Sequence, residues 1–155
     1  FGGTGFAFFA ALHFWWPKMF GRMYDFKKAY LAAVLITGGF MFHYVPMFIA
    51  GLKGMPRRYY DYLPQFENLN FFAGFGAALM IIGIFLLVVN LILTFRKPRD
   101  ASSDPWGGTT LEWQTPSPPP LHNFVTEPEL LEYPYDFRGV VKRYADTGDV
   151  QGSNN

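Results

Sequence analysis

The chain has 155 residues, half of them apolar and a fifth aromatic, with a formal net charge of +1. This charge is too small for the basic field that attracts nucleic acid, so no nucleic-acid partner is expected. The absence of cysteine excludes disulfides and thiolate metal sites. Phe1 opens directly into an apolar run, without a basic segment or a cleavage site. We therefore interpret the chain as a piece of something longer, either cut or the second half of a split subunit.

Three segments without charge alternate with short charged ones. The run Phe1–Trp16 reaches roughly 24 Å as a helix, short of the ~30 Å hydrocarbon core. We therefore expect residues 1–17 to be the second half of a transmembrane helix, ending at the aromatic anchor Trp15–Pro17. Residues 29–52 and 69–95 are each long enough to form a complete transmembrane helix.

The charged segments predict the topology. Residues 18–28 form a basic loop, and the basic cluster Arg96–Arg99 follows the last span. Two spans separate these basic segments, so they lie on one side of the membrane, which the positive-inside rule makes cytoplasmic. The connection at 53–68 is then extracytoplasmic.

Residues 96–155 have a different composition, because most of the 12 prolines lie there. Pro116–Pro120 is typical of extended polyproline II, and residues 147–155 are typical of disorder. Aromatic side chains indicate that the tail lies along a protein surface: Trp106, Trp113, Phe124, Tyr133, Tyr135 and Phe137. The predicted fold class is all-α integral membrane: one partial and two complete transmembrane helices, followed by an extended, proline-rich, cytoplasmic tail.

No catalytic or metal-binding set is visible. The histidines lie on three different segments, and none has a second histidine at i+3 or i+4: His13, His43 and His122. His43 is mid-span, where an ionisable group is functional by default. Its neighbours Thr37 and Tyr44, and the backbone freed by Pro46, favour a structural role instead. Asp61 and Glu67 are isolated carboxylates, and no nucleophile lies beside a base.

The polar run Gly51–Tyr62 (GLKGMPRRYYDY) contains two adjacent cations, Arg57 and Arg58, on the side that should be poor in cations. One interpretation is an interface loop that binds lipid headgroups. Against it, Pro56 fixes the backbone, and we expect the tyrosines to pack around the pair as a rigid mount: Tyr59, Tyr60 and Tyr62. The guanidinium fork suits carboxylates. A carboxylate-bearing cofactor between the helices is the sharper hypothesis.

Three motifs carry a family resemblance. The run Gly51–Tyr62 closely resembles a signature of subunit I of the haem–copper oxidases. His13–Arg22 (HFWWPKMFGR) resembles the end of that subunit's tenth span. Asp104–Trp113 (DPWGGTTLEW) and Thr115–Phe124 (TPSPPPLHNF) resemble the cytoplasmic tail of bacterial cytochrome c oxidases. The resemblance covers nearly the whole chain.

This resemblance implies the second half of span ten, span eleven and span twelve of an inner-membrane respiratory subunit that reduces dioxygen to water and pumps protons. It implies low-spin and high-spin haem and copper in the assembled enzyme, with Arg57 and Arg58 binding the haem propionates. The family's metal ligands lie before the position of Phe1, so this chain alone is expected to bind no metal and to be inactive. The family often has a histidine at the position of Phe48, which leaves the role of His43 open. Asp61 matches a position near a peripheral sodium or calcium site in some members.

The implied partners are the remainder of subunit I, subunits II and III, cytochrome c as the electron donor, and membrane lipid. Two alternatives stay open. A quinol oxidase shares much of this region and lacks the dinuclear copper site in its partner subunit. A non-enzymatic membrane scaffold would place the arginines on lipid.

Overall fold

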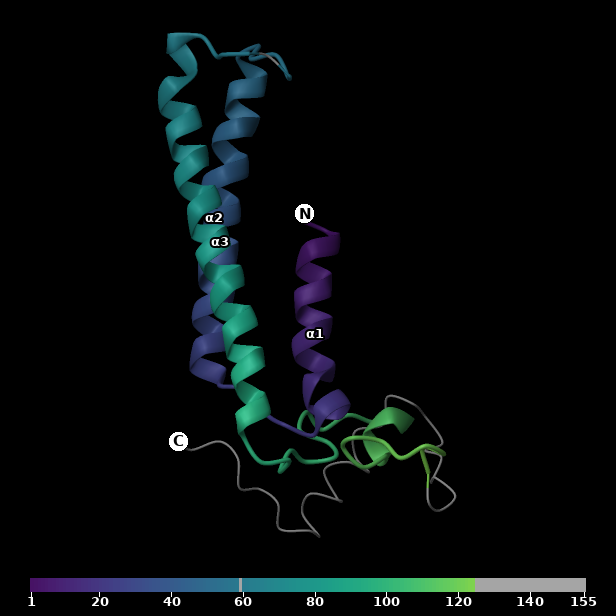
Figure 1. Cartoon of the computed structure of the whole chain (residues 1–155). Helices are drawn as coiled ribbons and strands as arrows, with labels where there is room; N and C mark the ends of the chain where they lie inside the picture. Colours follow the sequence, from purple (N-terminus) through teal and green to yellow (C-terminus); the bar gives the residue numbers. More distant parts are fainter. Residues whose placement is uncertain (59, 125–155) are drawn as a thin grey trace. The chain divides into compact units, whose positions relative to one another are not determined.

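The computed structural model describes residues 1–58 and 60–124, and every regular element in these two ranges is helical (Figure 1). Three α-helices follow one another: α1 (Thr4–Phe20), α2 (Phe26–Leu52) and α3 (Glu67–Leu93). Three short 3₁₀ helices accompany them: η1 (Pro64–Phe66), η2 (Thr94–Arg96) and η3 (Leu111–Gln114). The expectations for Tyr59, for the tail aromatics Tyr133, Tyr135 and Phe137, and for disorder at 147–155 lie outside the described residues.

The chain divides into two compact units. The first unit contains Tyr24–Arg96 together with Phe1–Gly2, and its main elements are α2 and α3. The second unit contains Gly3–Met23 and the region that begins at Lys97, so that α1 associates with the tail.

Within the first unit, α2 and α3 form a hairpin of two long helices side by side (Figure 1). Glycines bring their backbones together. A Cβ added to Gly76 would overlap the backbone nitrogen of His43, and one added to Gly39 would lie 2.6 Å from the backbone nitrogen of Met80. No side chain larger than hydrogen fits there without moving a backbone. Small residues allow this close approach, as is usual between helices in lipid.

Polar groups fix where α2 begins. Asp25 caps the helix, because its Oδ1 accepts a hydrogen bond from the Lys28 backbone N–H at 3.2 Å. The buried amide of Asn90, on α3, holds Asp25 from the other side. Its Nδ2 donates to the Asp25 carbonyl at 2.9 Å, and its Oδ1 accepts from the Asp25 N–H at 3.3 Å. The helix therefore begins at Phe26, earlier than residue 29, and Lys28 lies in its first turn.

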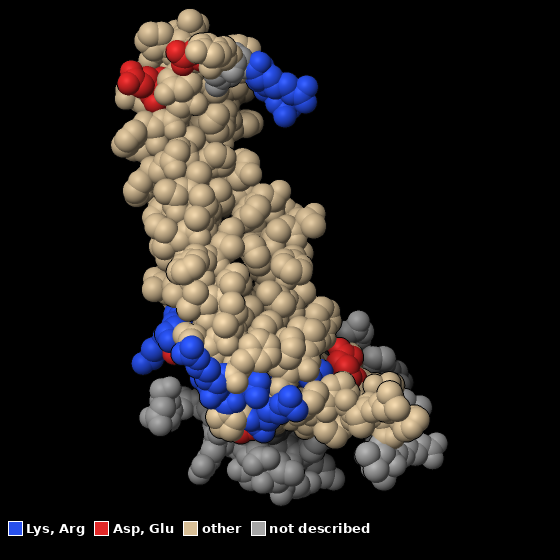
Figure 2. All heavy atoms as spheres, viewed as in Figure 1, with Lys and Arg blue, Asp and Glu red and all other residues tan. Residues whose placement is uncertain are grey.

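Both helices of the hairpin are long and apolar enough to cross a membrane, with candidate spans at Phe26–Leu52 and Pro64–Arg96. Large apolar side chains cover the faces that point away from the helix pair, including Phe48, Phe71 and Phe85, each more than two-thirds exposed. Figure 2 shows almost no charge along the length of the hairpin between its ends. This distribution is the one expected of helices that face lipid or other apolar helices. It agrees with the two complete spans that the sequence predicts.

Within the second unit, α1 continues past Pro17 and ends at Phe20. The helix itself therefore continues three residues beyond Pro17, whereas the end of the membrane span at residue 17 stays a prediction. Gly21 ends the helix, in the left-handed conformation at φ 64°, and its N–H donates to the Pro17 carbonyl at 2.8 Å. Lys18, which the sequence places in a loop, lies in the last helical turn.

Candidate functional site in the turn between α2 and α3

The candidate site is the turn at 53–63, where the chain leaves α2 and reverses into α3. Three backbone hydrogen bonds close the end of α2. The N–H groups of Lys53, Gly54 and Met55 donate to the carbonyls of Ile49, Gly51 and Ala50, at 3.0 to 3.1 Å. Gly54 has φ 85°, a left-handed conformation that glycine adopts without steric cost. The backbone therefore turns sharply three residues before the paired arginines.

Arg57 and Arg58 follow this bend, and both are exposed. Figure 2 shows the basic side chains of the turn projecting from this end of the hairpin. Arg58 itself has φ 58°, which is uncommon for a residue other than glycine, asparagine or aspartate. This conformation costs about 1–2 kcal/mol relative to the right-handed region. Strained backbone of this kind clusters at ligand-binding positions.

Of the tyrosines expected to form the mount, the structure describes Tyr60 and Tyr62. Tyr60 is fully exposed, and Tyr62 is 41% exposed. The expectation that Tyr60 packs around the arginines is therefore wrong, because it points into solvent. Tyr62 contributes its backbone instead, as its N–H donates to Asp61 Oδ1 at 2.8 Å. Among the described residues, backbone hydrogen bonds and the left-handed Gly54 shape the start of the turn.

The arginine pair has no carboxylate partner within the described part of the chain. The ion pair between Lys28 and Asp25, at 3.9 Å, lies at the other end of α2. No described group forms a hydrogen bond with the guanidinium of Arg57 or Arg58, so their donors are available to another molecule. Each guanidinium presents five N–H donors in a planar fork that matches a carboxylate or phosphate. The turn can therefore bind an anion through two adjacent forks.

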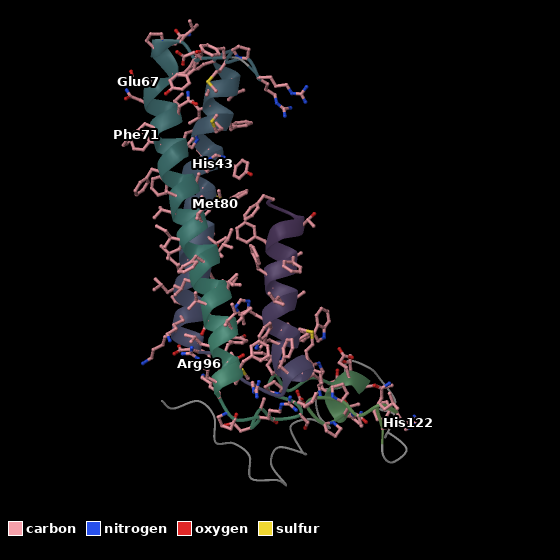
Figure 3. All side chains as sticks on the ribbon, in the orientation of Figure 1. His43, Glu67, Phe71, Met80, Arg96 and His122 are labelled. Carbon is pink, nitrogen blue, oxygen red and sulfur yellow. The ribbon has the colours of Figure 1, made fainter. Side chains whose placement is uncertain are left out.

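Two of the three histidines form hydrogen bonds within the fold. His43 Nδ1 lies 2.8 Å from the Ala73 carbonyl on α3, and since a carbonyl can only accept, Nδ1 carries the proton. The partner is therefore α3, and neither Thr37 nor the backbone near Pro46 is needed. His13 Nδ1 lies 2.8 Å from the Phe9 carbonyl in its own helix, and His122 is exposed. Figure 3 shows His43 in the hairpin, at a different level from Glu67.

No metal centre is formed by the residues that the structure describes. No group of three or more histidine, cysteine, aspartate or glutamate side chains gathers among residues 1–58 and 60–124.

Two polar residues with structural importance were missed by the sequence interpretation. Asn90 is the one amide in the second half of an apolar run, a signal that was present, whereas nothing local marks Lys18 as buried.

The fold and the site define the class first: a helical chain with two helices able to cross a membrane, joined by a turn that offers an anion two exposed arginines. The model of the cytochrome c and quinol oxidase polypeptide I family matches residues 1–84. The chain is 40% identical over 149 residues to cytochrome c oxidase subunit 1 of Thermostichus vulcanus, covering 96% of this chain and 27% of that protein. The chain belongs to the cytochrome c and quinol oxidase polypeptide I family, and the resemblance to subunit I is confirmed.

Relatives of both oxidase types match at similar identity. Cytochrome c oxidase subunit 1 of Bacillus subtilis is 42% identical over 82% of this chain and 21% of that protein. Cytochrome bo(3) ubiquinol oxidase subunit 1 of Buchnera aphidicola is 39% identical over 82% of this chain and 20% of that protein. The chain thus spans about a quarter of the length of these relatives or less. Family membership and the two apolar helices indicate an integral membrane protein.

Proposed function

We propose that this chain is the C-terminal part of the catalytic subunit of a proton-pumping cytochrome c oxidase that reduces dioxygen to water. The family match and the relatives named cytochrome c oxidase subunit 1 support this proposal. In the assembled enzyme, the rest of subunit I supplies the ligands of haem and copper. Subunits II and III and cytochrome c complete the complex in the bacterial inner membrane, with the tail on the cytoplasmic side.

Arg57 and Arg58 are the residues of this chain that bind the haem propionates in this proposal. The single observation that carries the assignment is that both guanidinium groups are exposed and have no acidic partner among the described residues. A haem has two propionates, so two adjacent forks fit its charge and its number of carboxylates. The left-handed Arg58 and the bend at Gly54 set the backbone from which the two forks extend.

The chemistry of this part of the chain is electrostatic. The haem supplies electron transfer when bound, and the arginines hold its carboxylates in the ionised form. An unpaired carboxylate in a low-dielectric site is strongly disfavoured, and a neighbouring cation lowers its pKa. The same positive charge stabilises the reduced haem, since reduction adds an electron to the group that the arginines face.

The test replaces each arginine in the complete subunit: Arg57→Gln and Arg58→Gln. Each substitution removes one positive charge that faces the haem in this proposal, and losing a nearby cation disfavours the reduced, more negative state of the haem. We expect the haem midpoint potentials to fall by tens of millivolts and the proton stoichiometry to decrease. Lys53→Gln is the matched control, because Lys53 is an exposed cation in the same turn. Unchanged potentials and stoichiometry in both arginine variants would refute the assignment.

A quinol-oxidising enzyme is the second candidate, supported by the quinol oxidase relatives at about the same identity. The two candidates differ in the partner subunit, which carries a dinuclear copper site only in the cytochrome c enzymes. Electron paramagnetic resonance of the purified complex distinguishes them by the signal of that site. A purified complex with no haem absorbance would instead favour the scaffold alternative.

A further inference from the structure

Lys18 is a buried lysine at the C-terminal end of α1, with 6% of its side chain exposed. Burying an ammonium group is costly unless hydrogen-bond acceptors replace its water. Burial lowers the pKa of Lys18, and the nearby carboxylates Asp104 and Glu112 oppose this shift. Since such burial is rare for lysine, its surroundings indicate a specific role.

The acceptors come from the tail, far along the chain. Lys18 Nζ donates to the Thr115 carbonyl at 2.6 Å and to the Ser103 carbonyl at 2.7 Å. Thr115 Oγ1 is a third, weaker acceptor at 3.4 Å. The ring of Trp113 lies 5.3 Å from Nζ, within the range of a cation–π interaction. Carbonyls and one aromatic ring therefore surround the ammonium group.

The tail donates hydrogen bonds to α1 in return. Trp106 Nε1 donates to the Phe14 carbonyl at 2.8 Å, and the Ala101 N–H donates to the Gly21 carbonyl at 3.2 Å. The Phe14 ring stacks on the Trp106 ring, with 6.1 Å between the ring centroids. It contacts the Trp113 ring edge-on, with 5.0 Å between the centroids. Donors from both partners and one aromatic cluster thus join the two segments.

The tail is shaped locally for this contact. Asp104 Oδ1 accepts a hydrogen bond from the Gly108 N–H at 2.8 Å, which closes a tight loop. A Cβ on Gly108 would overlap Cδ1 of Trp113, so the indole rests directly on the glycine backbone. At the other side, a Cβ on Gly21 would lie 2.8 Å from the Ser117 carbonyl oxygen. The tail backbone therefore touches α1 directly.

We propose that residues 101–117 form one cooperative docking segment for the C-terminal end of α1, and that Lys18 is its anchor. Removing the anchor releases the whole segment, because the two carbonyls that Lys18 binds lie near its two ends and the indoles lie between them. The docking segment attaches the tail to α1. This inference is independent of the oxidase type and of the role of the arginine pair.

The test measures amide hydrogen exchange by mass spectrometry on the assembled membrane complex that contains the full chain. Lys18→Met keeps the length of the side chain and removes its donors, and Lys27→Met is the control, since Lys27 is an exposed lysine on α2. We expect exchange of the Ala101 and Gly108 amides to rise together by about tenfold or more in Lys18→Met and to stay unchanged in Lys27→Met.

Unchanged exchange at Ala101 and Gly108 in Lys18→Met, or a rise at only one of them, would overturn the proposal. If Lys18→Met does not assemble, Gly108→Ala tests the same proposal by altering the tail. Its methyl group displaces the Trp113 indole and leaves the sequence of α1 unchanged. Cooperative docking then requires the Ala101 amide, which lies outside the Asp104–Gly108 loop, to exchange faster. A normal rate at Ala101 would refute it.

Discussion

Asn90→Leu tests whether one buried amide determines where α2 begins. Asn90 is 2% exposed, and its side chain binds both backbone groups of Asp25. Leucine has the same number of side-chain heavy atoms and the same branching at Cγ, so the substitution removes the hydrogen bonds without opening a cavity. The Asp25 carbonyl keeps a second partner, the Ala29 N–H at 3.0 Å. The main loss therefore falls on the contact between α3 and the cap of α2.

The structure sets the size of this loss. The bond from Nδ2 at 2.9 Å has ideal length and is worth about 1 kcal/mol. The bond to Oδ1 at 3.3 Å is slightly longer than the usual range and is worth about half of that. The sum, about 1.5 kcal/mol, agrees with interhelical polar contacts in membranes. It corresponds to about tenfold in a local opening equilibrium.

Hydrogen exchange in the first turn of α2 is the assay. We expect the amide of Lys28, which bonds to the Asp25 carboxylate, to exchange about tenfold faster in Asn90→Leu. Asn70→Leu is the matched control on the same helix. The Asn70 amide donates to the Phe66 carbonyl at 2.8 Å and to Met55 Sδ at 3.5 Å, near the start of α3 and far along the helix from Asn90. Equal exchange in the wild type and in Asn90→Leu would show that the cap is held by other contacts.

Three further predictions follow from close contacts and from one lysine. Gly76→Ala should destabilise the hairpin by about 1–3 kcal/mol, because its methyl group meets the α2 backbone. Gly74→Ala is the control and should be neutral, because nothing lies within 4 Å of its methyl group. Denaturant unfolding in mild detergent compares the free energies of unfolding of the two variants. Gly21→Ala should reduce the stability of the contact between the tail and α1 by at least about 1 kcal/mol, because alanine is strained at φ 64° and its methyl group meets Ser117. A normal protection factor at the Ala101 amide would contradict this prediction. The lowered pKa of Lys18 predicts that the protection factor of Gly108 rises with pH just below 10.5, because the undocked state then binds more protons. A neutral amine keeps two N–H donors for the two short bonds, so a falling protection factor in that window would refute the reasoning.

The local pattern of hydrophobicity was enough to predict the two long helices. Residues 29–52 and 69–95 lack charge, and helices lie over both ranges with ends within a few residues of those expected. Three motifs together indicated the family, and the family model that matches residues 1–84 confirms it. The packing of the side chains in the run Gly51–Tyr62 was not predictable from the sequence. The exposure of Tyr60 depends on the backbone conformation that Gly54 and the left-handed Arg58 adopt.

Sequence alone thus determined which segments are apolar, which turn carries the cations, and to which family the chain belongs, because charge, hydropathy and motif are properties of single residues and short runs. Only the tertiary structure decided which glycines join the helices. Gly76 meets the backbone of α2 while Gly74, two positions away, meets nothing within 4 Å. It also decided that Lys18 is a buried donor, since its Thr115 acceptor lies 97 positions away. Contacts over such separations depend on how the whole chain folds back, and no local pattern reports them.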